Sequence, residues 1–383
     1  MIRIAAFEFR KIFRSRLLAV MLVLLSLLNL YRIRGEYEKQ TAREECYRVG
    51  SARVYDEVSG TWDTAKIRYV TEEYEKASAQ VAAGDYSTEP NQPGTHTGFV
   101  FGDMGLFGEI RSSMERLWHY GENMQALTHK AADNAAFYAE KGNTYQARLN
   151  EKIARTYHNR SVPGYYRTDG LTQYLHYDFS ALLILLLMIP MLCPLFAAEH
   201  EAEMHGLLRL TQNARLLARA KLTAGAWAVG AVCALFFAED FAAFAVLWHI
   251  RGLAQPVYAL PEYAQSPLSC SIGVLLLLHA AIRLLGFAAL GSFCAAVSAF
   301  CKRELLPFCL GSALVLLLVL ADTFLPSPVN PVTLVSGAQS IRSFSVVRIG
   351  DTPVSAFLLP LTAGAAALIL PAAAVEMRCR REI

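Results

Sequence analysis

One short stretch of histidine and glutamate, His200-Glu201-Ala202-Glu203-Met204-His205, has residue types that can bind a metal ion. It nearly spells H-E-x-x-H, in which two histidines on one helix hold zinc and the glutamate acts as a base. Those histidines are four residues apart, about 40° around the helix axis, so both rings face one ion. His200 and His205 are five residues apart, about 140°, and their rings diverge. This spacing disfavours zinc, and a membrane metalloprotease using His200, Glu201 and His205 stays the less favoured alternative.

A second group of ionisable residues interrupts long apolar runs. Glu239 and Asp240 lie in one run, and Arg283 lies in the next at a similar distance from the shared end. A charge in the middle of a bilayer costs about 2.5–3.5 kcal/mol, so isolated charges are rare there. We therefore predict a buried pair between Arg283 and either Glu239 or Asp240, with His279 one helical turn away. Such a pair serves either as a tie between two helices or as a substrate- or gating-related polar site.

The elements that carry these residues are long apolar segments. Hydrophobic residues make up 54% of the 383 residues, which indicates a chain divided between membrane and water. About 20 apolar residues cross a bilayer as a helix, and six segments approach or exceed that length. They are residues 17–31, 179–198, 222–248, 271–300, 305–325 and 354–375. The first is short, but its basic amphipathic leader and the lack of an A-x-A-like site favour a span over a signal peptide.

The distribution of positive charge predicts the orientation of these spans. With the N-terminus inside, the inner segments 1–16, 199–221, 302–303 and 376–383 carry 14 Lys and Arg residues. The short outer loops carry three, Arg251, Arg342 and Arg348. Because cytoplasmic loops are enriched in Lys and Arg, both termini are predicted to be cytoplasmic.

Residues 32–177 are then extracellular. They hold 18 Lys and Arg and 20 Asp and Glu, mixed along the segment, which is typical of a solvated surface and not of a nucleic-acid-binding tract. The pattern is mainly helical, with a start predicted at Thr61, an end at Gly84 and a further start at Asn143. An apolar stripe at three- and four-residue steps predicts a helix with one buried face. The stripe consists of Leu106, Ile110, Met114, Leu117 and Tyr120.

Two absences narrow the chemistry. The eight cysteines form no C-x-x-C pair and most lie in or beside apolar runs, so neither a disulfide framework nor a zinc knuckle is indicated. The dipeptide Gly-Lys does not occur, so the chain has no G-x-x-x-x-G-K-[ST] phosphate-binding loop. If ATP is used, another polypeptide binds it.

The stretch FAAEHEAEMHGLLRLTQNARLLARAKL, residues 196–222, has an acidic start, a leucine-rich middle and a basic end, as in an amphipathic helix at a membrane surface. It resembles the loop between the second and third spans of ABC type-2 permeases. In that family a span ends in Glu-x-Glu, followed by Gly, a leucine-rich turn, an Arg step and a Lys. The matching residues are Glu199, Glu201, Leu207, Leu208, Arg215 and Lys221, while Glu203 stands where the family usually has Gly.

The N-terminus is similar to the same family. The stretch AAFEFRKIFRSRLLAVMLVLL contains Glu8, Lys11 and Arg14, which match a recurrent Glu-x-x-Lys-x-x-Arg in the amphipathic elbow helix before the first span. The order of elements matches over nearly the whole membrane part.

The resemblance implies an all-α integral membrane protein of six transmembrane helices with an N-terminal elbow helix. Its parts are the elbow and first span in 1–31, a mainly helical extracellular domain in 32–177, and the remaining spans in 178–383. The loop 199–221 is implied to be the coupling helix, with Glu199, Glu201, Glu203, Leu207, Leu208, Arg215 and Lys221 contacting a cytosolic ABC ATPase.

The implied function is that of a permease subunit of an ATP-driven exporter, not an enzyme, in a bacterial plasma membrane. ATP and Mg²⁺ are expected on the partner ATPase, and no metal or cofactor on this chain. A second permease and membrane lipid are the other expected partners, and nucleic acid is not one. A membrane-anchored sensor or scaffold, with a helical extracellular binding domain, is the alternative from another class.

Overall fold

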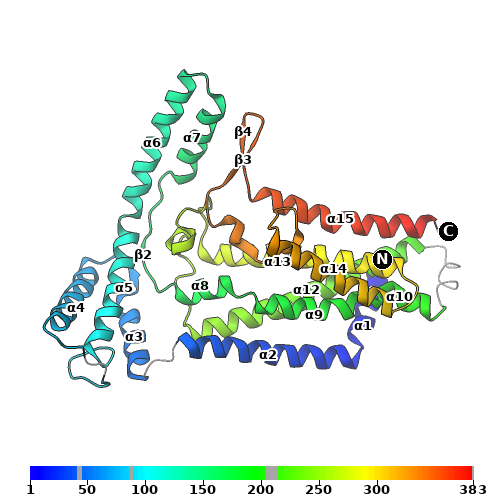
Figure 1. The fold of residues 1–383 in the computed structure, drawn as a ribbon, viewed down its shortest axis with the longest axis horizontal. Coiled ribbons are helices and arrows are strands. Elements are labelled where there is room, and N and C mark those ends of the chain that lie inside the picture. The colour runs from blue at the N-terminus through cyan, green and yellow to red at the C-terminus, as the bar shows by residue number, and fades with distance from the viewer. Residues whose placement is uncertain (41–44, 87–88, 204–213, 382–383) are drawn as a thin grey trace.

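The computed structural model describes residues 1–40, 45–86, 89–203 and 214–381. A bundle of long helices forms one part, and a second helical part stands across one end of that bundle (Figure 1). Both chain termini lie at the opposite end of the bundle. The chain is mostly helical, as predicted, and its two short two-stranded sheets are the exception.

Among the described residues, six helices or helical runs of the bundle are long and apolar enough to cross a membrane, as the sequence predicts. These are Arg16–Gln40, Asp169–Glu201, Arg215–Leu247, Ile272–Phe300, Leu305–Phe324 and Leu358–Arg378. They correspond to α2 (Arg16–Gln40), α8 to α10 (Asp169–His176, Phe179–Leu192, Pro194–Glu201), α12 (Ala214–Leu247), α13 (Ile272–Phe300), α14 (Leu305–Phe324) and α15 (Leu358–Arg381). The chain is therefore read as a multi-pass membrane protein.

The ends of some spans differ from the prediction. The first helix continues to Gln40, because the polar residues after Tyr31 are good helix formers and prolong it into the polar side. The last span begins at Leu358 and not at residue 354. Val354 instead belongs to strand β4 (Thr352–Ser355), which pairs with β3 (Val346–Ile349) in an antiparallel hairpin. A short apolar strand directly before an apolar helix cannot be told from the helix by the spacing of its hydrophobic residues, so the sequence placed the start of the helix too early.

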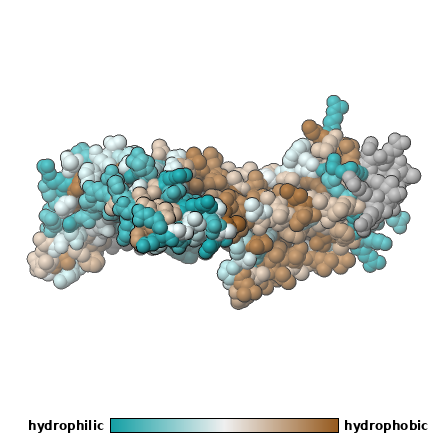
Figure 2. Space-filling model, turned by 90° about the horizontal axis from the view of Figure 1, so that it is seen from above, coloured by the Kyte–Doolittle hydropathy of each residue, from teal (hydrophilic) through white to brown (hydrophobic). Residues whose placement is uncertain are grey.

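Apolar side chains cover the sides of the bundle. Figure 2 shows hydrophobic residues over the bundle and mainly hydrophilic residues over the other part. Leu17, Leu277 and Leu305 are 68%, 72% and 75% exposed, which is expected of leucines that face lipid and not water. The bundle interior is closed by aliphatic and aromatic residues such as Leu187 and Phe287, both fully buried.

The second part, which we call the insert domain, is formed by α3 (Glu45–Val58), α4 (Thr64–Ala82), α5 (Val100–Trp118), α6 (Tyr120–Glu140) and α7 (Thr144–Tyr157). Its first and last segments are joined by β1 (Gly60–Thr61) and β2 (Gly164–Tyr165), which pair antiparallel. At Gly164 a Cβ would come within 2.1 Å of the Gly60 carbonyl oxygen, so the pairing requires glycine there.

The apolar stripe predicted from the sequence is the core of the insert domain. All five of its residues are buried, with exposures between 0% for Ile110 and 5% for Tyr120. The predicted start of α7 is also confirmed, because Asn143 caps it by accepting a hydrogen bond from the Gln146 N–H. The predicted start at Thr61 is wrong, since Thr61 lies in β1 and Asp63 caps α4 by accepting from the Ala65 N–H.

The insert domain is attached to the loop between α12 and α13, which contains the short helices Val257–Ala259 and Pro261–Tyr263. The Tyr157 hydroxyl donates to the Gln265 carbonyl at 2.6 Å, and Arg160 donates to the Ser266 carbonyl at 2.8 Å. Burial raises the pKa of Tyr157 to about 12, so the phenol remains a hydrogen-bond donor at neutral pH. These bonds fix the domain on one end of the bundle.

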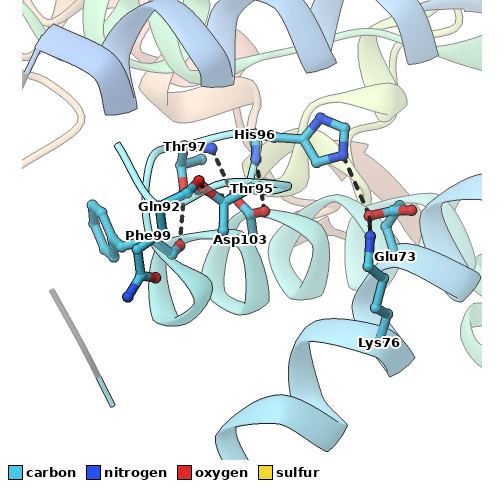
Figure 3. A network of polar contacts seen from close by, with 8 residues as sticks. All are labelled: Glu73, Lys76, Gln92, Thr95, His96, Thr97, Phe99 and Asp103. Atoms are coloured by element: carbon cyan, nitrogen blue, oxygen red, sulfur yellow. Dashed lines mark hydrogen bonds and ion pairs between the residues drawn. The ribbon is translucent and has the colours of Figure 1, made fainter. Parts of the chain in front are cut away.

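A buried carboxylate organises the loop before α5 (Figure 3). Asp103, 4% exposed, accepts hydrogen bonds from the backbone N–H of His96 at 2.8 Å and of Thr97 at 2.7 Å. It also accepts from the Thr97 hydroxyl at 2.6 Å. The neighbouring His96 ring lies 3.3 Å from a Glu73 carboxylate oxygen on α4. One side chain of α5 thus holds the loop against α4.

We predict that Asp103→Asn releases this loop. The amide places an N–H₂ group where a carboxylate now accepts three bonds, and hydrogen bonds to charged groups are each worth about 1.5–3 kcal/mol. Hydrogen exchange of residues 91–99 should become faster by at least tenfold, with little change in the bundle helices. Asp133→Asn, at an exposed position of α6, is the control. Equal exchange in the two variants would contradict the role of Asp103.

Candidate functional site

Helix α10 ends and helix α12 begins at the end of the bundle where both termini lie, and the loop 199–221 joins them (Figure 1). Its two ends are joined by an ion pair, since the Lys221 Nζ atom is 2.6 Å from a Glu199 carboxylate oxygen. Glu199 is on the last turn of α10, and Lys221 is on the second turn of α12. Two predicted residues far apart in the sequence therefore close the base of the loop.

Lys221 is the most buried charged residue of this region, with a side chain 1% exposed. Its ammonium group donates to the Leu195 carbonyl at 2.8 Å and lies 5.2 Å from the centre of the Phe196 ring. A lone buried ammonium is costly, so the contacts of Lys221 must replace the water it has lost. Glu199, the Leu195 carbonyl and the Phe196 ring supply these contacts.

Helix α1 (Ile2–Phe13) joins the same cluster of charges. Lys11 lies 3.2 Å from the second oxygen of Glu199, and it also lies 3.8 Å from Glu8. Glu8 is 6% exposed and faces the bundle, where α1 packs against α12. Two acidic and two basic residues, all predicted as site residues, thus form one network. We call Glu8, Lys11, Glu199 and Lys221 the basal cluster.

Two further acidic residues flank the cluster. The Glu201 carboxylate accepts a hydrogen bond at 2.7 Å from the backbone N–H of Glu304, the N-cap residue of α14. A carboxylate at a helix N-terminus also meets the positive end of the helix dipole. Glu203 has φ of 54°, a left-handed conformation that favours glycine.

The start of α12 is also tied to the last span. Arg219 donates two hydrogen bonds of 2.9 Å to Glu376 on α15, and Arg215 lies 3.6 Å from the same carboxylate. A bidentate pair of this kind constrains direction as well as distance. The predicted residue Arg215 therefore contributes to a link between α12 and α15.

Some predicted residues are not placed in this network. Leu207, Leu208 and His205 lie outside the described residues. Arg14 is the C-cap residue of α1, and it has no ion pair within the part of the chain that the structure describes. Glu201, the glutamate that the H-E-x-x-H pattern would use as a base, instead caps α14.

The predicted intramembrane residues lie together near the outer half of the bundle, the half next to the insert domain. Asn29 of α2, fully buried, donates to Glu239 at 3.2 Å and to Asp240 at 2.7 Å. The Ser26 hydroxyl also donates to Glu239, and the Tyr177 hydroxyl donates to the side-chain oxygen Oδ1 of Asn29 at 2.9 Å. The two carboxylates of α12 are therefore held by amide and hydroxyl groups of the first span and of the α8–α9 junction.

The predicted direct pair with Arg283 is wrong. Arg283, 2% exposed, forms no ion pair with Glu239 or Asp240 among the described residues. It donates to the Ser180 hydroxyl at 3.4 Å, and Ser180 lies next to the Asp240 carboxylate. The guanidinium also covers the Phe237 ring at 5.1 Å. The prediction used only the depth of each residue along its helix, and depth does not determine how α12 and α13 are rotated about their axes. In the structure, Ser180 lies between Arg283 and Asp240.

His279 lies one turn from Arg283 on α13, as predicted, but it faces a different partner. Its Nδ1 atom accepts a hydrogen bond of 3.1 Å from the Ala338 N–H in the segment between α14 and α15. Gly337 has φ of 69°, and a Cβ there would lie 2.3 Å from the His279 ring. His279 therefore anchors the short helices Pro331–Leu334 and Gly337–Ile341 against α13.

Several residues of these networks were not expected from the sequence. Asn29, Ser180 and Tyr177 are polar residues within or beside apolar segments, which is a weak signal because single polar residues are common there. Glu376 is an acidic residue at the start of a tail that also carries Arg378, Arg380 and Arg381, and that change of sign could have drawn attention to it. The contacts of these residues depend on which helices pack against each other, and that packing is seen only in the structure.

Comparison with known proteins identifies no relative. No protein-family model matches the chain, and no curated protein or solved structure gives a significant match.

We predict that Glu199→Gln lowers the stability of the bundle strongly. Removing one partner of a buried ion pair costs about 3–5 kcal/mol, because the other charge stays buried without compensation. The double variant Glu199→Gln/Lys221→Met should recover most of that loss. The measurement is denaturant unfolding of the purified protein in detergent.

The control for this prediction is Glu38→Gln. Glu38 lies 2.7 Å from Arg34, a distance like that of the buried pair, but both side chains are more than half exposed. Exposed pairs contribute about 0–1 kcal/mol, so the control should change little. Similar losses in Glu199→Gln and Glu38→Gln would show that burial of Lys221 does not set the energy of the pair.

Proposed function

We propose that the chain is the permease subunit of an ATP-driven ABC exporter. In this proposal it forms half of a translocation pathway with a second permease, and a separate cytosolic ATPase supplies the energy. The resemblance of residues 5–25 and 196–222 to ABC type-2 permeases suggests the class. The six long apolar helices are consistent with it.

The observation that best supports the proposal is the basal cluster. A coupling element must pass force from a partner to the membrane helices, and a loose loop would absorb that force. Here the base of the loop is closed by Lys221 and Glu199, and Lys11 ties it to α1. Movement of the loop would therefore move α1, α10 and α12 together.

Two further links extend the same argument. Glu201 connects the loop to the start of α14, and Arg219 with Arg215 connects it to α15 through Glu376. Most of the bundle helices would thus respond to one displacement. In the proposed mechanism, ATP and Mg²⁺ bound by the partner subunits bring those subunits together, and the loop transmits that motion. The polar residues around Asn29 would keep α2, α9 and α12 in register during the motion.

The proposal includes an orientation. The loop 199–221 and both termini are on the cytoplasmic side of a bacterial plasma membrane, and the insert domain is extracellular. The charge bias of 14 to three Lys and Arg residues between the two sets of short segments supports this orientation.

We predict that a membrane-impermeant thiol reagent distinguishes the two sides in intact cells. In a background with the native cysteines replaced by serine, including Cys46 and the half-exposed Cys270, Ala136→Cys on the exposed face of α6 should react. Ala202→Cys, exposed at the end of α10, should react only after the cells are permeabilised. Reaction of Ala202→Cys from outside would overturn both the orientation and the coupling role.

We predict that an ATPase carrying G-x-x-x-x-G-K-[ST] co-purifies with the wild-type chain from its native membrane. Glu201→Lys should reduce the amount recovered, and the ATP hydrolysis measured with it, by at least fivefold. Reversal of charge at this exposed position changes the surface beside the loop. Glu140→Lys, an exposed position of α6, is the matched control and should recover the wild-type amount. Recovery of no such ATPase with the wild type, or of equal amounts with both variants, would contradict the proposal.

A further inference from the structure

A large cavity separates the insert domain from the bundle. It has a volume of about 700 Å³ and lies where the last turns of α2 and α12 meet α3, α5 and α8. This volume is within the range of about 300–1,000 Å³ that is typical of sites for small molecules. None of the residues discussed for the coupling loop lines it, so it is a separate feature of the molecule.

The floor of the cavity is aromatic and lies at the ends of two spans. Tyr37 of α2 meets Trp248, directly after α12, edge to face with ring centres 5.0 Å apart. The Trp248 indole N–H donates to the Gln40 side-chain oxygen at 3.0 Å, which fixes the ring. Tryptophan and tyrosine at the ends of membrane helices lie at the level of the lipid head groups. The floor is therefore in the interfacial layer of the membrane.

The wall of the cavity carries both signs of charge. Arg167 donates from Nε to Asp169 at 2.8 Å, and its guanidinium lies 4.4 Å from the centre of the Tyr55 ring. These two contacts hold the guanidinium plane in place before any ligand arrives. Glu109 of α5 and Arg48 of α3 line the same space. Neither sign dominates, so the site suits a ligand that carries both.

A smaller hollow of about 160 Å³ adjoins the cavity and shares Tyr55, Arg167 and Trp248 with it. At its edge Arg251 and Asp56 form an ion pair of 2.7 Å. The polar side of the site therefore extends toward the insert domain, and the aromatic side extends toward the membrane. A ligand with a polar head and an apolar tail would fit this arrangement, with its head toward the insert domain and its tail toward the membrane.

We propose that this cavity binds the head group of a zwitterionic phospholipid, of the phosphatidylethanolamine class, from the adjoining leaflet. Its phosphate is held by Arg167, which offers planar N–H donors to phosphate oxygens. Its ammonium lies toward the carboxylate of Glu109, which lines the cavity and carries the opposite charge. Its acyl chains leave past Tyr37 and Trp248. Binding would join the insert domain to the bundle through a lipid, independently of any ATPase partner.

The test uses the full-length protein purified in detergent and titrated with short-chain phosphatidylethanolamine, with the thermal unfolding temperature as the readout. Thr172→Trp fills the cavity with an indole ring. Thr71→Trp, also at a half-buried helical threonine, fills a separate groove between α4 and α5 and is the matched control. Wild type and Thr71→Trp should show a saturable rise in unfolding temperature, and Thr172→Trp should bind at least tenfold more weakly.

Several results would overturn the inference. If phosphatidylethanolamine raises the unfolding temperature of Thr172→Trp as much as that of the wild type, the lipid binds elsewhere. If phosphatidylglycerol, which has no ammonium, stabilises the wild type as much as phosphatidylethanolamine does, the ammonium has no role in binding. Stabilisation by an amphipathic peptide but not by lipid would make the cavity a peptide site. If Thr172→Trp does not fold, a phosphatidylethanolamine with a photoreactive head group decides with the wild-type protein. Cross-links in α3 and α8, competed by unlabelled lipid, support the proposal, and cross-links confined to other helices refute it.

Discussion

The buried ammonium of Lys221 is the constraint on which the arrangement of the bundle end near both termini depends. A charge that is 1% exposed has no water to stabilise it, so its neighbours must supply hydrogen bonds and opposite charge. Glu199 and the Leu195 carbonyl do so only if α10 and α12 lie in one relative position. Because a buried ion pair contributes little net stability over an apolar pair, its effect is mainly to specify that position. The ion pair between Lys11 and Glu199 then holds helix α1 at the same place.

The polar residues within the apolar helices are also largely buried away from water, but neutral hydrogen-bond donors and not an opposite charge stabilise them. Glu239 and Asp240 are adjacent like charges, which repel in a medium of low dielectric constant. Asn29 separates them by donating to both, and the Tyr177 hydroxyl in turn donates to Asn29. Three helical segments are thereby joined at one depth without a direct ion pair. Arg283 completes the group through Ser180, so the charges interact across a hydroxyl and not by contact.

The insert domain and the bundle differ in which residues they bury and which they expose. Both patterns meet at the boundary between them. The domain has a core of buried aliphatic and aromatic residues such as Ile110, and its exposed face is charged. The bundle exposes leucine on its sides and buries its polar groups. At the boundary, tyrosine, tryptophan and arginine occur together around the cavity, since each has an apolar body and a polar end. That composition is what an interface between lipid head groups and protein requires.

The amino-acid sequence by itself determined the number of long apolar helices, the apolar stripe of α5 and the Asn143 cap, because each depends on residues close in the chain. The resemblance to ABC type-2 permeases, and not residue pattern alone, pointed to Glu8, Lys11, Glu199 and Lys221. Only the tertiary structure decided that these four meet, that Asn29 and not Arg283 holds the two carboxylates, and that residues 354–357 end a hairpin before the last helix starts. Helical periodicity gives the depth of a residue along its own axis. The rotation of one helix against another depends on packing over the whole bundle, and that rotation selects which polar groups face each other.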